Sequence, residues 1–349
     1  MAVNTTLAEV SNLLVYSSMA AYTGALVGFA VDLSGRGRVP SSQHAVAIPA
    51  QQLVGVPSTA PLGPVTGSAA SLEAEPGSSA GVRPPVEAVS AGAAGSRGAA
   101  IAVALTWLAV ALHAAAVLTR GLSSSRVPWG NMYEFALTGA LVVAAVFLGL
   151  VVWRRDLRWL GVFAVGPVLL TIGLALTVLY TDSAQLVPAL QSPFLIVHVF
   201  IAFISSALFT LAFSVNVLQL VQDKRGQARE RGRAPSRGLF MDRLPAAAEL
   251  EQLGYRMVAL SFPLWTFTLV AGAIWAEQAW GRYWGWDPKE VWTFVIWVVY
   301  AAYLHARATR GWDGRRATYL SIAGFVCVLI NFGIVNVFFS GQHSYAGIG

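Results

Sequence analysis

Tryptophan is concentrated in one short stretch of this 349-residue chain. Six of the twelve tryptophans fall between residues 275 and 297, and they are Trp275, Trp280, Trp284, Trp286, Trp292 and Trp297. Flat rings beside a few polar groups form a platform that suits a large, flat, apolar ligand. The alternative is an aromatic belt, because tryptophan gathers at membrane interfaces. A belt does not need this many tryptophans in one loop, so we expect a binding platform.

Two histidines lie near the level of this stretch. At about 1.5 Å per residue, His198 lies roughly 8 Å inside one end of an expected helix over residues 193–221. His343 follows just beyond the corresponding end of an expected helix over residues 317–339. Neutral imidazole is a common axial ligand of haem iron. Each histidine alone would more often be structural, but as a pair beside the tryptophans they indicate ligation of iron in a flat ring.

Two further histidines do not fit that site. His305 lies roughly 6 Å from the opposite end of its helix by the same rise, so it cannot reach the tryptophans. His113 differs from His305 in depth by about 15 Å, whereas two axial ligands of one iron need nitrogens about 4 Å apart. We therefore expect His305 to need another partner, and we interpret His113 as a polar packing residue.

Carboxylates near the tryptophans have two interpretations each. Asp287 and Glu290 are the candidates for an acid or base, but equally they cap the next helix or pair with Arg282 or Lys289. Glu134 opens another apolar run, where a carboxylate needs a partner or a function. Contact with water or with a nearby arginine such as Arg126 is the structural alternative for Glu134.

Membrane helices must position all of these residues. The chain is 56% hydrophobic and 11% charged, with a mean hydropathy of +0.61, which is typical of a polytopic membrane protein. Continuous apolar runs are long enough to cross the hydrocarbon as helices rather than barrel strands. We predict an all-α bundle of eight spans, near residues 12–31, 99–119, 132–153, 159–180, 193–221, 255–276, 291–309 and 317–339.

The basic residues predict the orientation of the spans. Only four of the 23 lysines and arginines fall in or beside the connectors of one side, and these are Arg120, Arg126, Arg282 and Lys289. The other 19 lie on the opposite side. The positive-inside rule then places both termini and the tryptophan segment outside. It also explains the formal charge of +6 more simply than nucleic-acid binding does.

The composition of the chain also indicates its redox chemistry and its division into segments. Cys327 is the only cysteine, so the chain has no disulfide, no thiol pair and no haem-attachment motif of its own. No basic residue precedes Arg36, so we expect the first apolar run, within residues 1–32, to be retained as a span. Residues 33–98 are rich in Pro, Gly and Ala and are predicted to be a flexible cytoplasmic connector before a membrane domain at 99–349.

Several motifs resemble a known family. The run Trp280-Gly281-x-x-Trp284-x-Trp286-Asp287-Pro288-Lys289-Glu290 resembles the WWD signature of haem-handling proteins of cytochrome c biogenesis. The runs that end at His198, surround His305 and begin at His343 resemble the CcsA/ResC family of system II, called CcsB in some bacteria. The resemblance covers about residues 99–349. The first span fits only loosely, and the connector has no recognised counterpart.

The resemblance implies a membrane subunit of the system II cytochrome c synthase in the bacterial cytoplasmic membrane. Haem b would be carried to the outer face and presented for thioether attachment to the CxxCH motif of apocytochrome c. His198 and His343 would bind the outer iron, and the cofactor platform in segment 277–290 and just beyond would comprise Trp280, Gly281, Trp284, Trp286, Asp287 and Trp292. His305 would bind haem iron near the inner side, opposite a ligand from a ResB/CcsB-type partner.

Two alternatives stay open at this point. The chain could export or deliver haem without ligation activity of its own, or it could transport another amphipathic solute. Thiol-reducing proteins would be indirect partners, because this chain has no redox pair. No catalytic acid or base is assigned.

Overall fold

The computed structural model describes residues 4–35, 97–184, 190–232, 240–309 and 312–343. The predicted connector at 33–98 lies outside these ranges apart from its two ends. By contacts the chain divides into residues 1–37 with 95–349 and residues 38–94, and only the first unit is described below. The described part is helical without strands, and eight of its helices are long and apolar enough to cross a membrane. The prediction of an all-α, eight-span protein is confirmed.

The spans are formed by eight long helices and a few short segments. They are α1 (Thr5–Gly35), α2 (Arg97–Ser123), α3 (Met132–Trp153), η1 (Arg155–Leu160) with α4 (Gly161–Thr177), α5 (Pro193–Glu230), α6 (Ala247–Trp280), α7 (Pro288–Ala308) and α8 (Arg315–Leu329), which continues through the π-helical turn η4 (Ile330–Val335) into α9 (Asn336–Phe338). The short 3-10 segment η3 (Met241–Arg243) precedes α6.

Local sequence explains where the helices beside the site begin and end. The Asn131 side chain accepts from the backbone N–H of Glu134 at 2.9 Å and caps α3. Ser192 caps α5, whose first residue is Pro193, and Asp287 caps α7, whose first residue is Pro288. Helix α6 ends at Gly281, which has a φ of 70° and so forms a left-handed C-cap.

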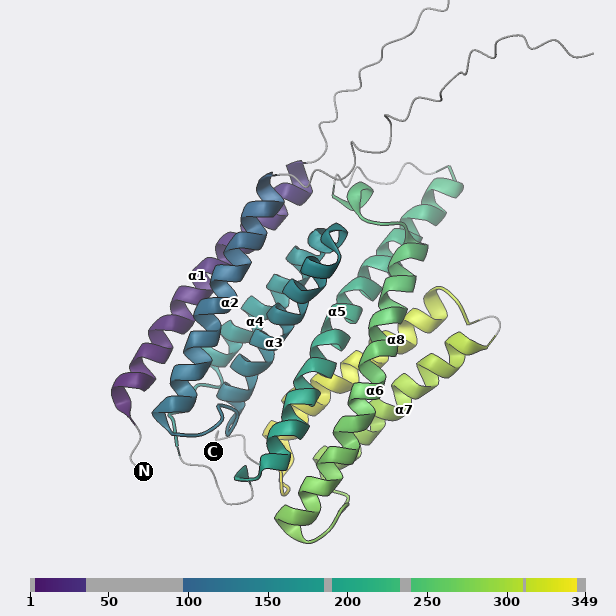
Figure 1. The fold of residues 1–349 in the computed structure, drawn as a ribbon. Coiled ribbons are helices and arrows are strands. Elements are labelled where there is room, and N and C mark those ends of the chain that lie inside the picture. Colours follow the sequence, from purple (N-terminus) through teal and green to yellow (C-terminus); the bar gives the residue numbers. More distant parts are fainter. Residues whose placement is uncertain (1–3, 36–96, 185–189, 233–239, 310–311, 344–349) are drawn as a thin grey trace, which may run out of the picture. The chain divides into compact units, whose positions relative to one another are not determined.

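The helices pack mainly in consecutive pairs. Helix α1 packs against α2, α3 against α4, α5 against α6 and α7 against α8, while α5 also contacts α3 and α8 (Figure 1). Polar pairs link α5 to its neighbours inside the apolar layer. Ser205 and Ser261 bond across α5 and α6 at 2.8 Å, and Asn216 donates to Ser321 on α8 at 2.8 Å. Such pairs stabilise helix contacts in lipid, where apolar burial gives little preference.

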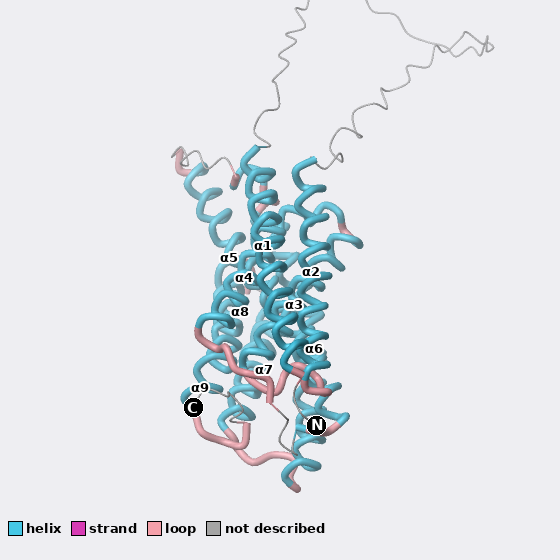
Figure 2. The backbone as a smooth tube through the Cα atoms, turned by 90° about the vertical axis from the view of Figure 1, so that its left-hand side faces the viewer, coloured by secondary structure: helices cyan, strands magenta, loops and turns pink. Residues whose placement is uncertain are grey.

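The loops that carry the candidate residues lie at one end of the bundle. The beginning of α1, the loop between α6 and α7 and the end of α9 all lie at the lower end in Figure 1, and Figure 2 shows several loops at that end. An even number of spans requires this common location. Helices α7 and α8 are inclined to α5 and α6 (Figure 1).

Candidate functional site

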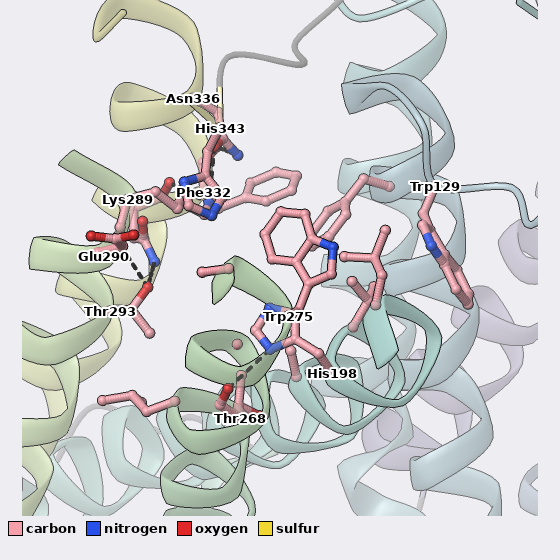
Figure 3. A pocket seen from close by; sticks show the side chains of 18 of the residues that line it. Trp129, His198, Thr268, Trp275, Lys289, Glu290, Thr293, Phe332, Asn336 and His343 are labelled. Atoms are coloured by element: carbon pink, nitrogen blue, oxygen red, sulfur yellow. Dashed lines mark hydrogen bonds between the residues drawn. The ribbon is translucent and has the colours of Figure 1, made fainter. Parts of the chain in front are cut away.

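A cavity of about 210 Å³ lies at this end of the bundle, between α3, α5, α6, α7 and the last turns of α8. Most of its wall is apolar. Its tryptophan, histidine, lysine, glutamate and asparagine residues are Trp129, Asn131, His198, Trp265, Trp275, Trp284, Lys289, Glu290, Asn331, Asn336 and His343. Figure 3 labels His198, Trp275 and His343 among them. The structure therefore brings His198 and His343 to one cavity, although 145 positions separate them in the sequence.

His198 is held against α6 by a backbone oxygen. Its Nδ1 lies 2.9 Å from the carbonyl oxygen of Thr268. Because a carbonyl can only accept, Nδ1 carries the proton and donates, and in the neutral ring Nε2 keeps its lone pair. Gly272 makes room for this ring, since a Cβ there would lie 2.7 Å from the His198 Cε1. The imidazole is therefore oriented with a free nitrogen that can bind a metal.

His343 is held by a carboxylate. Its Nδ1 lies 2.9 Å from Asp287 Oδ1. Burial raises the pKa of Asp287, but the hydrogen bond and charge of His343 and the backbone N–H groups of Lys289 and Gln342 outweigh it and lower the pKa to about 2. Asp287 is therefore ionised and accepts, so His343 Nδ1–H donates. A carboxylate behind a histidine fixes the tautomer that leaves Nε2 for iron.

Trp275 lies against both imidazoles. Its ring is nearly parallel to His198, with centroids 6.2 Å apart and an interplanar angle of 13°. It meets His343 edge-on at 5.6 Å, and Trp280 meets the same imidazole at 4.9 Å. The buried Trp275 thus connects the two histidines through one aromatic cluster. Trp284 adds an aromatic side chain to the cavity wall.

A cation and several amides form the polar part of the wall. Lys289 Nζ donates to the carbonyl oxygen of Asn331 at 3.1 Å and to Asn336 Oδ1 at 3.0 Å. No carboxylate within the described ranges pairs with this ammonium group. Asn331 lies in the π-helical turn of the eighth span, and such turns are frequent at functional sites. The buried Asn331 Oδ1 has no hydrogen-bond partner among the residues that the structure describes. This wall therefore combines a lysine amine that pairs with no described carboxylate and an amide oxygen that has no partner among the described residues.

Asp287 and Glu290 together cap α7. The Glu290 Oε2 accepts from the backbone N–H groups of Gly285 at 2.8 Å and Asp287 at 3.1 Å, which completes a capping box. Its Oε1 lies 3.6 Å from Arg282 Nη1, an ion pair without hydrogen-bond geometry. The capping interpretation is confirmed for both carboxylates, while a role in proton transfer stays a prediction.

The predicted platform residues occupy different places. Trp284 lines the cavity, Trp280 packs behind His343, and Gly281 ends α6. Trp286 is 75% exposed, and Trp292 is half-buried and outside the cavity lining. Trp129 and Trp265 were not part of the predicted tryptophan cluster, and Trp275 was in the cluster but not among the cofactor-binding residues that the resemblance implies, yet all three line the cavity. The spacing of Trp265, Thr268, Gly272 and Trp275 places them on one face of α6, and that pattern was the missed signal.

The remaining candidates lie away from the cavity. His305 is exposed on α7 and makes no hydrogen bond within the part of the chain that the structure describes. His113 is fully buried on α2, with its Nδ1 3.4 Å from the Tyr22 hydroxyl, as expected of a packing residue.

Glu134 is the centre of a buried ion cluster. It accepts from Arg126 at 2.6 and 3.0 Å and from Arg120 at 3.2 Å. The expected pairing with arginine is confirmed, and contact with water is not, because Glu134 is 1% exposed. The two guanidinium groups also bond to the carbonyl oxygens of Thr181 and Ala184. The cluster therefore ties α2 and α3 to the segment after α4.

The part of the chain that resembles known proteins includes all the residues that line the cavity. The family model described as Cytochrome C assembly protein matches residues 129–343, from the first to the last residue of the cavity wall. A cytochrome c biogenesis protein CcsA from Picosynechococcus is 34% identical over 65% of this chain and 82% of its own length. The CcsA proteins of Guillardia theta and Microcystis aeruginosa are 36% and 34% identical, over 65% and 66% of this chain and 79% and 83% of their own. The chain thus belongs to the CcsA family of cytochrome c assembly proteins, multi-pass membrane proteins with a role in cytochrome c maturation.

Proposed function

We propose that this chain carries haem b to the outer face of a bacterial cytoplasmic membrane and presents it for thioether attachment to the CxxCH motif of apocytochrome c. One observation carries the proposal. Two imidazoles line one cavity, and each has its Nδ1–H bound to an oxygen acceptor, so that each can offer Nε2 to iron. The names of the relatives agree, since each is a cytochrome c biogenesis protein.

The residues of the cavity fit haem. His198 and His343 supply two nitrogen ligands from different segments of the chain. Trp275, which contacts both imidazoles, and Trp284 supply aromatic faces for a flat macrocycle. Lys289 is the natural partner for a propionate carboxylate, because a buried cation is stabilised by an anion. Haem is here the substrate that the chain binds and releases.

Thioether attachment requires mainly that the protein position the thiols next to the haem vinyl groups. Each thiol adds across one vinyl group of the haem, so an S–C bond forms, the S–H bond breaks, and the proton goes to the other vinyl carbon. Holding thiol and vinyl carbon together replaces a bimolecular encounter and can contribute several kcal/mol. The addition consumes no oxidant. Reducing equivalents that keep the thiols free come from thiol-reducing proteins.

A partner membrane protein of the ResB/CcsB type completes the proposed synthase. The cations concentrate at the end of the bundle opposite the cavity, which supports an outward cavity. His305 is exposed on α7 at that inner side, where a ligand from a partner can face it. It would bind haem before transfer to the outer cavity.

The test is haem binding by variants of the purified complex. We expect His198→Ala and His343→Ala each to lose the Soret spectrum of a bis-histidine haem, with partial recovery when imidazole is added. His113→Gln is the matched control, because this histidine lies outside the cavity and should leave that spectrum unchanged. Retention of haem and of cytochrome maturation in both alanine variants would contradict the proposal.

A second measurement separates attachment from delivery. The purified chain, with and without its partner, is incubated with reduced haem and a CxxCH peptide, and covalent haem on the peptide is measured. Covalent product requires ligation activity in the complex. Bound haem without product supports a delivery module, and the lack of any Soret band supports a transporter of another solute.

A further inference from the structure

The connection between α3 and α4 carries three arginines at the end of the bundle opposite the cavity. Helix α3 begins at Met132, which lines the cavity, and its 22 residues end at Trp153 (Figure 1). Its length of about 33 Å matches the thickness of the hydrocarbon layer. The chain then passes at once through η1 into the next span. The connection is too short to leave the membrane surface, so its arginines lie at the level of the lipid headgroups.

The geometry of η1 places Arg155 and Arg158 on one face. Residues 155–160 form a 3-10 helix, in which side chains three positions apart eclipse each other. Leu157 and Leu160 share another face by the same spacing, and both are buried, which holds η1 against the bundle. At a rise of about 2 Å per residue, the backbone positions of the two arginines are about 6 Å apart. One small anion can therefore contact both guanidinium groups.

No carboxylate of the described residues neutralises this pair. Asp156 is the only carboxylate of the connection, and it accepts two hydrogen bonds from Arg154, at 3.0 and 2.8 Å. No hydrogen bond or ion pair in the described ranges uses the side chain of Arg155 or Arg158, and the buried Nε of Arg158 lacks an acceptor. Other carboxylates at this end pair with other arginines, and these are Asp223, Asp242 and Glu251. A buried donor without an acceptor is costly, so the pair is complementary to an anion from outside the chain.

Apolar side chains beside the arginines distinguish a lipid from a free anion. Val152 is 66% exposed and Trp153 is 81% exposed, and both directly precede the arginines. The ring of an interfacial tryptophan lies between the headgroups and the acyl chains. A free phosphate ion gains nothing from such a surface, whereas a phospholipid places its acyl chains next to its phosphate. Basic sites beside membrane helices bind anionic lipid headgroups in this way.

We propose that η1 binds the phosphate group of an anionic phospholipid through Arg155 and Arg158, with the acyl chains against Val152 and Trp153. The planar guanidinium group donates two parallel hydrogen bonds to phosphate oxygens, which a lysine cannot do. The general preference for cations on one side of a membrane requires only positive charge. It explains neither two arginines on one face nor the buried Nε of Arg158. The site is independent of haem binding.

The experiment titrates the purified full-length protein, in an uncharged detergent, with phosphatidylglycerol, and bound lipid is counted by native mass spectrometry. Phosphatidylcholine is the lipid without net charge, and glycerol phosphate is the headgroup without acyl chains. The variants are Arg155→Gln, Arg158→Gln and Arg158→Lys, of which the last keeps the charge. Arg256→Gln is the matched control, because Arg256 is an exposed cation of α6 at the same end of the bundle.

We expect each glutamine variant to bind phosphatidylglycerol about 5-fold more weakly, and Arg158→Lys to lose part of that affinity. Arg256→Gln should bind as the wild type does, and phosphatidylcholine should bind more weakly than phosphatidylglycerol. Wild-type affinity in Arg158→Lys would overturn the proposal, because charge alone would then suffice. Equal binding of the two lipids would overturn it as well. Competition by glycerol phosphate at the same concentration as the lipid would also contradict it, and would indicate a site for free phosphate groups.

Discussion

Replacing Asp287 by asparagine tests whether a carboxylate holds His343 in the form that can bind iron. Asp287 Oδ1 accepts from His343 Nδ1 at 2.9 Å and from the backbone N–H of Lys289 at 3.0 Å. Its Oδ2 accepts from the backbone N–H of Gln342 at 2.7 Å. Asparagine puts one oxygen and one NH₂ group in the same space. Whichever way the amide turns, at least one of the present donors faces another donor.

Both orientations of the amide weaken His343 as a ligand. With the oxygen in the place of Oδ1, Gln342 loses its acceptor and the segment before His343 is held less firmly. With the NH₂ group in that place, the imidazole must accept at Nδ1, and the neutral ring then carries its proton on Nε2, where iron would bind. Loss of such an outer partner costs about 10- to 100-fold in metal affinity, which corresponds to about 1.4 to 2.7 kcal/mol. In the first orientation the cap of α7 is preserved, because asparagine caps as well as aspartate. In the second orientation the backbone N–H of Lys289 also loses its acceptor.

The assay is a haem titration of the purified complex, followed at the Soret band. Asp156→Asn is the matched control, because this exposed carboxylate pairs with Arg154 in the connection after α3, at the other end of the bundle. We expect weaker haem binding only in Asp287→Asn. Unchanged affinity together with an unchanged bis-histidine spectrum in that variant would refute the argument that Asp287 sets the tautomer of His343.

Three further substitutions test other contacts of the site. Gly272→Ala should push the His198 ring from its place, cost about 1 to 3 kcal/mol of packing and weaken haem binding in the titration, whereas Gly173→Ala, with open space around the new Cβ, should leave haem binding unchanged. Lys289→Met should abolish the preference for haem over its dimethyl ester in competition measurements, because only the free acid offers a propionate to the ammonium group; an unchanged preference would exclude that pairing. Glu134→Gln leaves two buried arginines without their carboxylate and should lower the free energy of unfolding by about 3 to 5 kcal/mol, measured by thermal denaturation in detergent, while the folded fraction keeps its haem spectrum.

The eight spans could be predicted because a helix that crosses the hydrocarbon core needs about 20 consecutive apolar residues, and such runs are visible in the sequence. The ends of α3 match the predicted limits 132–153, whereas the ends of α5 and α6 do not. Helix α5 continues to Glu230 and α6 begins at Ala247, beyond the predicted limits of 221 and 255. Backbone hydrogen bonds continue outside the membrane when polar residues find partners, as Gln222 does by donating to the carbonyl oxygen of Met241 at 2.8 Å. The hydropathy of a sequence does not reveal such contacts.

The position of a residue along the axis of its helix was predictable. The side of the helix on which the residue lies was harder to predict. A rise per residue is enough to place His198 and His343 at one level and His305 at another, and His198 and His343 do line one cavity. Their role as iron ligands stays a prediction. Which tryptophans face the cavity depends on the rotation of each helix and on loop geometry. Trp275 is buried on α6 and lines the cavity, whereas Trp286 is 75% exposed in a loop where the N–H groups of Gly285 and Asp287 donate to Glu290.

The two histidines are held by acceptors of different kinds, and under the proposed function this difference predicts the order in which haem would be released. The acceptor for His198 is a backbone carbonyl of α6, and the histidine itself lies within α5, so neither can move without a helix. His343 follows the last helix and is held by the side chain of Asp287 and by the aromatic contact with Trp280. Side-chain contacts of a loop break at a lower free energy than the packing of a helix. When the histidine of a cytochrome takes over one side of the iron, His343 is therefore the ligand that we expect to be replaced first.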